Sequence, residues 1–401
     1  MPILSSNPMW EAFGLRALPY ALYGGADTGE CVTTVERVGD EGSADDWHRE
    51  WRATADRVAA IGEECERREH WVSMREAYFR AATYYRVSYL PLFGSPVDER
   101  LKEAFADEER IFLRAAEWST PAIEAVEIPF EGATVPGYFV HTDWTERPRP
   151  TVIHTDGYDA NIQEMYFAHG PAATRRGYNC LLFDGPGQGR NLIQDALHMR
   201  PDWETVVKAV VDYALTRPEV DAQKLVLAGW SFGGFLAARA AAFEKRIAAL
   251  IADPGQWDQR ENLKVLPVDP AVVADIEHAD AALFEPFEQW LRSPKADPML
   301  RWKVIQRGMW VHGAKNLWEL AKEMARFEIS PVAGEIACPT LLTAAEGDPV
   351  AAGAQTLYDA LRCKKTLVRF TEAEGSGGHC EGLARGLYHQ RVFDWLDETL
   401  G

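Results

Sequence analysis

The sequence predicts an α/β fold in which a mostly parallel central sheet is flanked by helices, with an N-terminal helical domain and an inserted helical cap. The first observation is that continuously apolar strands alternate with helical segments between residues 150 and 252, as in a parallel sheet covered on both faces. The second is that this alternation stops near Gly255 and resumes at Pro339, which indicates an insertion. The third is the length of 401 residues, because such a chain needs more than one ordinary hydrophobic core.

Four blocks follow from this pattern. We expect an N-terminal helical lid domain over residues 1–122, the first part of the α/β core over 123–258, the cap over 259–332, and the second part of the core over 333–401. Apolar residues at spacings of three and four predict amphipathic helices over 47–61 and 72–92. A β-hairpin is expected around the turn Glu131-Gly132. Buried strands are expected over 150–154, 178–184, 224–228, 247–252, 339–344 and 365–370, and a closing helix over 383–400.

Composition and charge exclude several classes of partner. The chain has 42 basic and 61 acidic residues, a net charge of −19, so nucleic acid is not an expected partner. No apolar run reaches the roughly 18–20 residues of a membrane span, and the segment from Met1 to Ser6 lacks the features of a secretory signal. The six cysteines form no CxxC pair, which indicates reduced thiols in a cytoplasmic protein with no metal site and no disulfide framework.

The segment Gly229-Trp230-Ser231-Phe232-Gly233 has the features of a nucleophile elbow. It follows an apolar strand and precedes an alanine-rich helical segment, which is the context that such an elbow requires. In so tight a turn, the residues two before and two after the serine must lack side chains, and the serine is pushed out above the sheet. We therefore expect Ser231 to be a catalytic nucleophile; the alternative is a plain strand-to-helix turn whose glycines serve packing.

A serine nucleophile needs a base that takes its proton. His379 lies in a glycine-rich loop after the last predicted strand and before the closing helix, and it is the expected base. His312 falls in a helical stretch of the cap, and His389 falls inside the closing helix, where we expect a structural role. Cys380 follows the expected base directly and is interpreted as a bystander.

The base in turn needs a carboxylate that holds the correct tautomer. Asp348 follows the strand that ends at Ala344, and it precedes His379 by enough residues for one helix and one strand. We expect Asp348 to be this acid. Glu346 is the rival because it lies two residues nearer the end of the strand.

Acyl transfer also needs backbone N–H donors for an oxyanion. One is expected from Phe232, the residue after the nucleophile. The other is expected in the loop after the strand over 150–154, where Gly157 permits a turn; we assign it to Tyr158, with Gly157 next. The glycine-rich run over 184–189 fits neither a dinucleotide nor a phosphate-binding loop. We interpret it as a tight turn that packs near the elbow, and we expect no cofactor.

Together these motifs resemble a group of α/β-hydrolases that includes dihydroxypseudooxynicotine hydrolase and the fungal polyketide-shortening hydrolases of melanin pathways, related to prolyl-oligopeptidase-like serine hydrolases. The resemblance covers nearly the whole chain, and the N-terminal helical segment is what narrows it to this group. The matching residues are Ser73-Met74-Arg75-Glu76-Ala77-Tyr78, Gly157-Tyr158-Asp159, Gly187-Gln188-Gly189, Gly229-Trp230-Ser231-Phe232-Gly233-Gly234, Glu346-Gly347-Asp348 and Gly378-His379-Cys380.

The resemblance implies an α/β-hydrolase fold with helical segments over the active site and a triad of Ser231, Asp348 and His379. Some members of the group cleave a carbon–carbon bond beside a ketone, so we expect hydrolysis of a β-diketone type bond in a small aromatic or polyketide-like metabolite. An esterase, lactonase or thioesterase with the same triad is the alternative, ahead of a peptidase, an acyltransferase or a catalytically dead binding protein. No pattern selects an oligomeric state, and a homodimer built on the N-terminal helices is left open.

Overall fold

The computed structural model describes residues 2–143, 145 and 147–401. Within them, eight strands form one sheet in the order β1-β2-β4-β3-β5-β6-β7-β8. The β1–β2 hairpin is antiparallel and β2 runs antiparallel to β4, whereas the remaining neighbours are parallel, which confirms the predicted fold class. The strands are β1 (Ile123–Phe130), β2 (Ala133–Val140), β3 (Arg149–Thr155), β4 (Asn179–Phe183), β5 (Val220–Trp230), β6 (Ala249–Asp253), β7 (Thr340–Ala345) and β8 (Lys365–Phe370).

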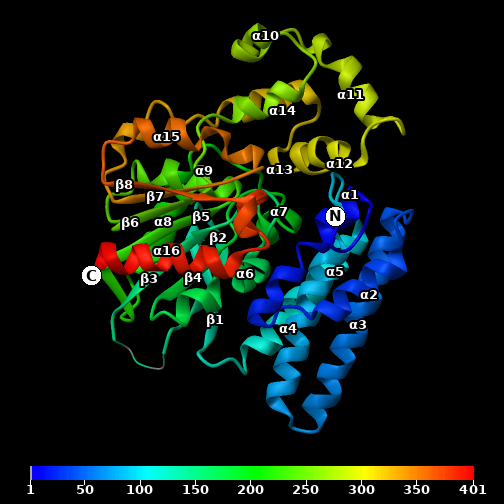
Figure 1. Ribbon diagram of the computed structural model, residues 1–401, viewed down its shortest axis with the longest axis vertical. Helices are drawn as coiled ribbons and strands as arrows, with labels where there is room; N and C mark the ends of the chain where they lie inside the picture. Colours follow the sequence, from blue (N-terminus) through cyan, green and yellow to red (C-terminus); the bar gives the residue numbers. More distant parts are fainter. Residues whose placement is uncertain (1, 144, 146) are drawn as a thin grey trace.

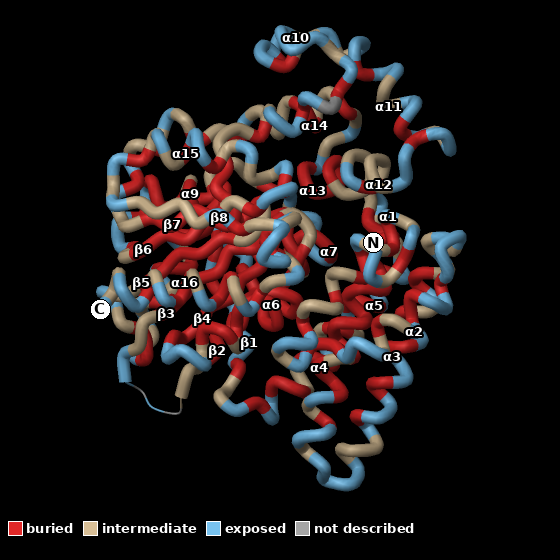
Figure 2. Tube along the Cα trace, viewed as in Figure 1, coloured by how far each residue is buried: buried red, intermediate tan, exposed pale blue. Residues whose placement is uncertain are grey.

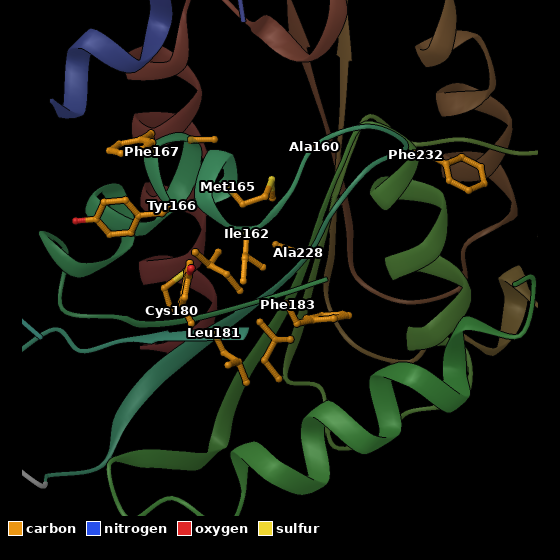
Figure 3. Packing of buried hydrophobic residues seen from close by; sticks show 14 of the residues in the cluster. Ala160, Ile162, Met165, Tyr166, Phe167, Cys180, Leu181, Phe183, Ala228 and Phe232 are labelled. Atoms are coloured by element: carbon orange, nitrogen blue, oxygen red, sulfur yellow. The ribbon is translucent and has the colours of Figure 1, made fainter. Parts of the chain in front are cut away.

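Helices cover both faces of this sheet (Figure 1). α6 (Ile162–Thr174) and α16 (Arg385–Leu400) pack on one face, and α8 (Trp203–Ala214), α9 (Phe232–Ala241) and α15 (Ala354–Ala360) pack on the other. The five residues of β4 are all buried, as is typical of a strand covered on both sides. Figure 3 shows Ile162 and Met165 of α6 and Cys180 and Leu181 of β4 within the same hydrophobic cluster.

The register of the central strands determines which loops meet. Thr155 at the end of β3 pairs with Gly229 of β5, and Trp230 at the end of β5 pairs with Asp253 of β6. Because parallel strands bring their carboxyl ends to one edge of the sheet, the loops after β3, β5 and β6 are neighbours.

The N-terminal helices pack against the sheet domain through aromatic side chains. They are α1 (Pro8–Gly14), α2 (Thr28–Val38), α3 (Ala44–Arg67), α4 (Trp71–Ser88) and α5 (Glu99–Ala116). Phe112 of α5 stacks on Tyr138 of β2 with ring centroids 4.8 Å apart, and Phe79 of α4 meets Phe167 of α6 edge-on at 5.4 Å. The N-terminal helices and the sheet therefore share one continuous hydrophobic core. None of the helices in the described residues is both long and apolar enough to cross a bilayer.

The helix expected over 72–92 ends earlier, at Ser88. Pro91 explains the difference, because a proline has no N–H and its ring clashes with the carbonyl of residue i−4. That carbonyl belongs to Val87 and accepts a hydrogen bond from Trp47 Nε1 at 2.9 Å. The carbonyl of Ser88 is bound by His48 Nδ1 at 3.2 Å. Two side chains of α3 therefore satisfy two carbonyl groups at the end of the interrupted helix.

The segment between β6 and β7 forms a cap of short helices that lies above the sheet and the N-terminal helices in Figure 1. The cap contains α10 (Pro270–Ala274), α11 (Glu285–Arg292), α12 (Pro298–Arg301), α13 (Met309–His312), α14 (Leu317–Ala325) and, between α12 and α13, a π-helix, η6 (Trp302–Gly308). Its outer part buries a hydrophobic cluster of its own, and Figure 2 shows much of its surface exposed. Trp302 instead joins the main core, where it stacks on Phe93 at 5.6 Å and donates from Nε1 to Leu90 O at 2.7 Å.

Candidate active site

Ser231 stands in a strained turn between β5 and α9. Its backbone has φ 59° and ψ −127°, a conformation that is costly for a residue with a side chain. A Cβ on Gly229 would lie 1.9 Å from the carbonyl oxygen of Gly233, and a Cβ on Gly233 would lie 2.5 Å from that of Thr155. The turn therefore closes only with glycine at both positions. Ser231 N donates to Asp253 O at 2.6 Å, which fixes the serine at the edge of the sheet.

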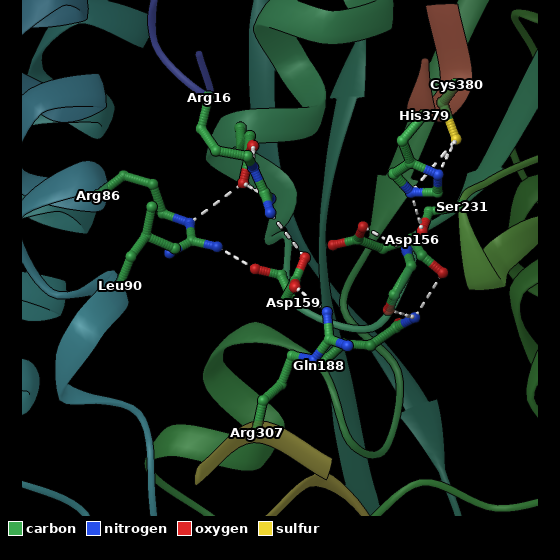
Figure 4. Close-up of polar contacts among 12 residues, drawn as sticks. Arg16, Arg86, Leu90, Asp156, Asp159, Gln188, Ser231, Arg307, His379 and Cys380 are labelled. Carbon is green, nitrogen blue, oxygen red and sulfur yellow. Dashed lines mark hydrogen bonds and ion pairs between the residues drawn. The ribbon is translucent and has the colours of Figure 1, made fainter. Parts of the chain in front are cut away.

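The structure brings the three residues of the expected triad together, and Figure 4 shows two of them, Ser231 and His379, side by side. Ser231 Oγ lies 2.8 Å from His379 Nε2, and His379 Nδ1 lies 3.0 Å from Asp348 Oδ2 and 3.1 Å from Oδ1. This geometry suits an imidazole whose Nδ1–H donates a hydrogen bond to the carboxylate while Nε2 accepts one from the serine hydroxyl. The side chain of Asp348 is fully buried, whereas 48% of the His379 side chain is exposed, so the imidazole remains accessible to solvent.

The histidine contacts Asp348 and not its rival, Glu346. Burial alone would raise the pKa of Asp348, but the hydrogen bond and charge of His379 and the N–H groups of Val350 and Cys380 bring it below its usual value. Glu346 is exposed, and its carboxylate accepts the N–H of Glu372 at 2.9 Å on the far side of the loop.

The thiol of Cys380 lies beside the histidine but is protonated. Its Sγ is 3.6 Å from both ring nitrogens of His379. Burial, with the nearby carboxyl groups of Asp253 and Asp348, raises the thiol pKa well above its usual value. Cys380, His379 and Asp348 are the one set of potential metal ligands gathered within the described residues. The imidazole and carboxylate already satisfy each other, however, and a neutral thiol is a poor ligand.

Gly157, in the loop after β3, lies directly against Ser231. A Cβ at this position would be 2.9 Å from Ser231 Cβ and 2.9 Å from Trp230 O. Gln188 Nε2 supports the loop by donating to Asp156 O at 2.7 Å and Gly157 O at 3.1 Å, which confirms that the turn over 184–189 packs near the elbow. Burial, together with Asp184, raises the pKa of the Asp156 carboxyl in this loop well above its usual value.

A family model described as Alpha/beta hydrolase family matches residues 161–386, more than half of the chain. The chain belongs to this family. A second model, described as Esterase FrsA-like, matches residues 37–255 and thus includes most of the N-terminal helices. The resemblance inferred from the sequence motifs is confirmed.

Fungal hydrolases are similar to this hydrolase over almost its whole length. Hydrolase LUC6 of a Fusarium species is 30% identical over 96% of this chain and 95% of its own. The 20-hydroxy-prefusarin hydrolase FUS2 of Gibberella moniliformis is 29% identical with the same coverage. Among solved structures, that of 2,6-dihydroxy-pseudo-oxynicotine hydrolase matches with a TM-score of 0.74 at 22% identity, covering 96% of this chain and 95% of that chain; at this identity the match shows the shared fold.

Two of the other histidines have structural partners in this hydrolase. His312 Nε2 is hydrogen-bonded to the hydroxyl of Tyr158, and burial lowers the pKa of His312 to about 3, so the imidazole stays neutral. This hydrogen bond connects the cap to the loop after β3, and the Tyr158 ring also stands edge-on to Phe232 of α9, with centroids 4.9 Å apart. His389 is buried in α16, and its Nδ1 lies 3.0 Å from the hydroxyl of Tyr23.

Sequence reasoning missed a buried ionic cluster beneath the histidine loop of this hydrolase. Arg385 Nη1 donates to Cys380 O at 3.0 Å and lies 3.5 Å from Asp253 Oδ2, while Thr343 Oγ1 donates to Asp253 Oδ1 at 2.8 Å. Burial raises the pKa of Asp253 and of its neighbour Glu381, so at least one of the two holds a proton. Through these contacts Arg385 holds the loop that contains His379 against the end of β6. The one signal for it in the sequence was an arginine six residues after the histidine.

Proposed function

We propose that this hydrolase cleaves a carbon–carbon bond next to a ketone, as in a β-diketone, in a small aromatic or polyketide-like molecule. The observation that carries the serine chemistry is the hydrogen bond of 2.8 Å between Ser231 Oγ and His379 Nε2, with His379 Nδ1 held 3.0 Å from Asp348. Nucleophile, base and orienting acid thus stand in the order that acyl transfer requires.

The proposed reaction begins when Ser231 Oγ attacks the ketone carbonyl and His379 Nε2 takes the hydroxyl proton. The tetrahedral oxyanion collapses, the carbon–carbon bond breaks, and its electron pair leaves as an enolate stabilised by the second carbonyl. His379 returns the proton to that carbon. Water, deprotonated by the same base, then attacks the acyl-enzyme, releases a carboxylic acid and restores the serine.

We assign the oxyanion donors to the N–H groups of Phe232 and Tyr158. Phe232 is the first residue of α9, and an N–H at a helix start has no partner within the helix. Among the described residues, the N–H of Tyr158 also has no acceptor, whereas Gly157 N–H donates to Asp156 Oδ1. This difference favours Tyr158 over Gly157. The raised pKa of Asp156 opposes a negative charge on this carboxyl near the developing oxyanion.

The choice of a small organic substrate is supported by relatives that are named as hydrolases of 2,6-dihydroxy-pseudo-oxynicotine and of 20-hydroxy-prefusarin. The aromatic rings of Tyr158 and Phe232 beside the nucleophile suit a flat, apolar substrate. Ester hydrolysis is a second candidate, because the Esterase FrsA-like model matches residues 37–255. It uses the same intermediates with an alcohol as the leaving group.

A matched substrate pair tests both candidates. An aryl β-diketone and the isosteric aryl ester are given to the wild type and to Ser231→Ala, and the products are identified by mass spectrometry. Diketone cleavage by the wild type that the variant loses supports carbon–carbon hydrolysis. Cleavage of the ester alone replaces the first candidate with the second. No cleavage of either, together with no fluorophosphonate adduct on Ser231, contradicts both.

A further inference from the structure

Asp159 lies two residues after Gly157 and collects ionic partners from outside the α/β core (Figure 4). Its Oδ1 is 2.7 Å from Arg16 Nη1, and its Oδ2 is 2.6 Å from Arg307 Nη1. Its backbone carbonyl accepts a hydrogen bond from Arg86 Nη2. Every one of these acceptor atoms therefore binds an arginine from a different segment.

The three arginines come from the two helical parts that cover the sheet. Arg16 follows α1, Arg86 lies in α4, and Arg307 lies in the π-helix of the cap. Burial alone would raise the pKa of Asp159, but the charges of Arg16 and Arg307 hold it far below its usual value. The two guanidinium groups thus favour the ionised carboxylate, and both of its oxygens are engaged.

The π-helix explains how the cap reaches this position. Hydrogen bonds from residue i to i+5 place residues five apart on one face, and Arg307 accordingly lies over the ring of Trp302 at 5.0 Å. Trp302 is anchored on the carbonyl of Leu90 at 2.7 Å. The guanidinium of Arg307 also lies 5.1 Å from the ring centroid of Tyr158, so the cap holds both Tyr158 and Asp159.

Arg16 extends the same restraint to the end of the loop. Its Nε and Nη2 donate to the two carboxylate oxygens of Glu164, each at 2.7 Å, in a bidentate pair at the start of α6. Asn161, the N-cap of α6, accepts the N–H of Glu164 at 3.0 Å. The loop from Gly157 to Asn161 is thus fixed at its far end to the helix and in its middle to three arginines.

We propose that Asp159 is a positioning residue that aligns the N–H of Tyr158 with the nucleophile only when the N-terminal helices and the cap are both docked. The structure offers no arginine of the α/β core for this role among the described contacts of Asp159. The inference rests on the proposed function, because it concerns the oxyanion donor of that reaction.

The test uses Asp159→Asn and Arg307→Met in the full-length protein, with Arg292→Met as the matched control. Arg292 pairs with Glu288 at 2.9 Å within α11 of the cap, away from the loop. Reactive sites are first counted by the end-point of fluorophosphonate labelling, and kcat and KM for an aryl ester are then measured per labelled site. A displaced N–H costs up to about 100-fold in rate.

We expect kcat to fall at least tenfold in Asp159→Asn and Arg307→Met, with KM within threefold of wild type and full labelling at the end-point. Arg307→Lys should recover part of the loss, and Arg292→Met should stay within twofold of wild type. The proposal would be overturned if kcat per labelled site stayed within twofold of wild type in both loop variants. It would also be overturned if a fall in activity were explained entirely by a smaller number of labelled sites. If Asp159→Asn does not fold, Arg307→Met decides. Failure of the wild type to label, together with no turnover of either the aryl ester or the aryl β-diketone, would instead overturn the proposed function.

Discussion

Substitution of Gly157 by alanine tests the contact between the loop after β3 and the nucleophile. The added Cβ would lie 2.9 Å from both Ser231 Cβ and Trp230 O, whereas ordinary van der Waals contact begins near 3.4 Å. The loop must therefore retreat by about 0.5 Å, and the N–H of Tyr158 moves with it. A hydrogen bond of about 2.9 Å from this N–H to the oxyanion would lengthen to about 3.4 Å, beyond the usual range. Loss of one donor costs about 10²–10³ in rate, so this partial loss should lower kcat by about 10- to 100-fold.

The assay is turnover of an aryl ester per fluorophosphonate-reactive site, with the melting temperature measured in parallel. Gly29→Ala is the matched control: its Cβ meets only Asp27 Oδ1, at 3.5 Å, in helix α2, far from the site. Alanine is also the better helix former, so the control should keep full activity and melt no lower than wild type. A Gly157→Ala protein with wild-type kcat would refute the reasoning, because the working loop would then not contact Ser231 as described.

Two further predictions concern carboxyl groups. Asp348→Asn should lower kcat by about 10³–10⁴-fold, since the imidazole loses its orienting partner, whereas Glu346→Gln should stay within threefold; steady-state kinetics that reverse this order would make Glu346 the acid. Burial raises the pKa of Glu108 from 4.5 to about 8. The free energy of unfolding that depends on the protonated carboxyl is therefore fully present below about pH 4.5, and it is lost as the pH rises through 8. Glutamine has no proton to lose. The melting temperature of Glu108→Gln should therefore rise relative to wild type between pH 5 and pH 9, and a constant difference would contradict the assignment.

Features encoded within a few neighbouring residues could be predicted from the sequence. The elbow at Ser231 has its glycines, strand and helix within a short segment, and the α/β class follows from apolar strands that alternate with helices. Asp348 and His379 were found from their order after β7 and β8, and the structure places them within hydrogen-bond distance of each other. Their roles remain the prediction that the kinetics above test.

The contacts of Asp159 could not be predicted, because its partners are 143, 73 and 148 residues away in the chain. The chain has 42 basic residues, and no local pattern marks Arg16, Arg86 and Arg307 among them. The π-helix was missed for a related reason: its periodicity over Trp302–Gly308 is too short to be distinguished from that of an α-helix.

The separate hydrophobic cluster of the outer cap has a consequence for how this protein can diversify. Leu263, Phe284, Leu291 and Leu320 pack with one another and not with the sheet, while the segment from Trp302 to His312 carries the bonds to Leu90, Asp159 and Tyr158. Met309 of that segment also belongs to the outer cluster, so residues 302–312 connect the outer cap to the N-terminal helices and to the loop after β3. A relative's residues put in place of 263–300 should therefore keep the contacts of Trp302, Arg307 and His312 when they also pack on Met309.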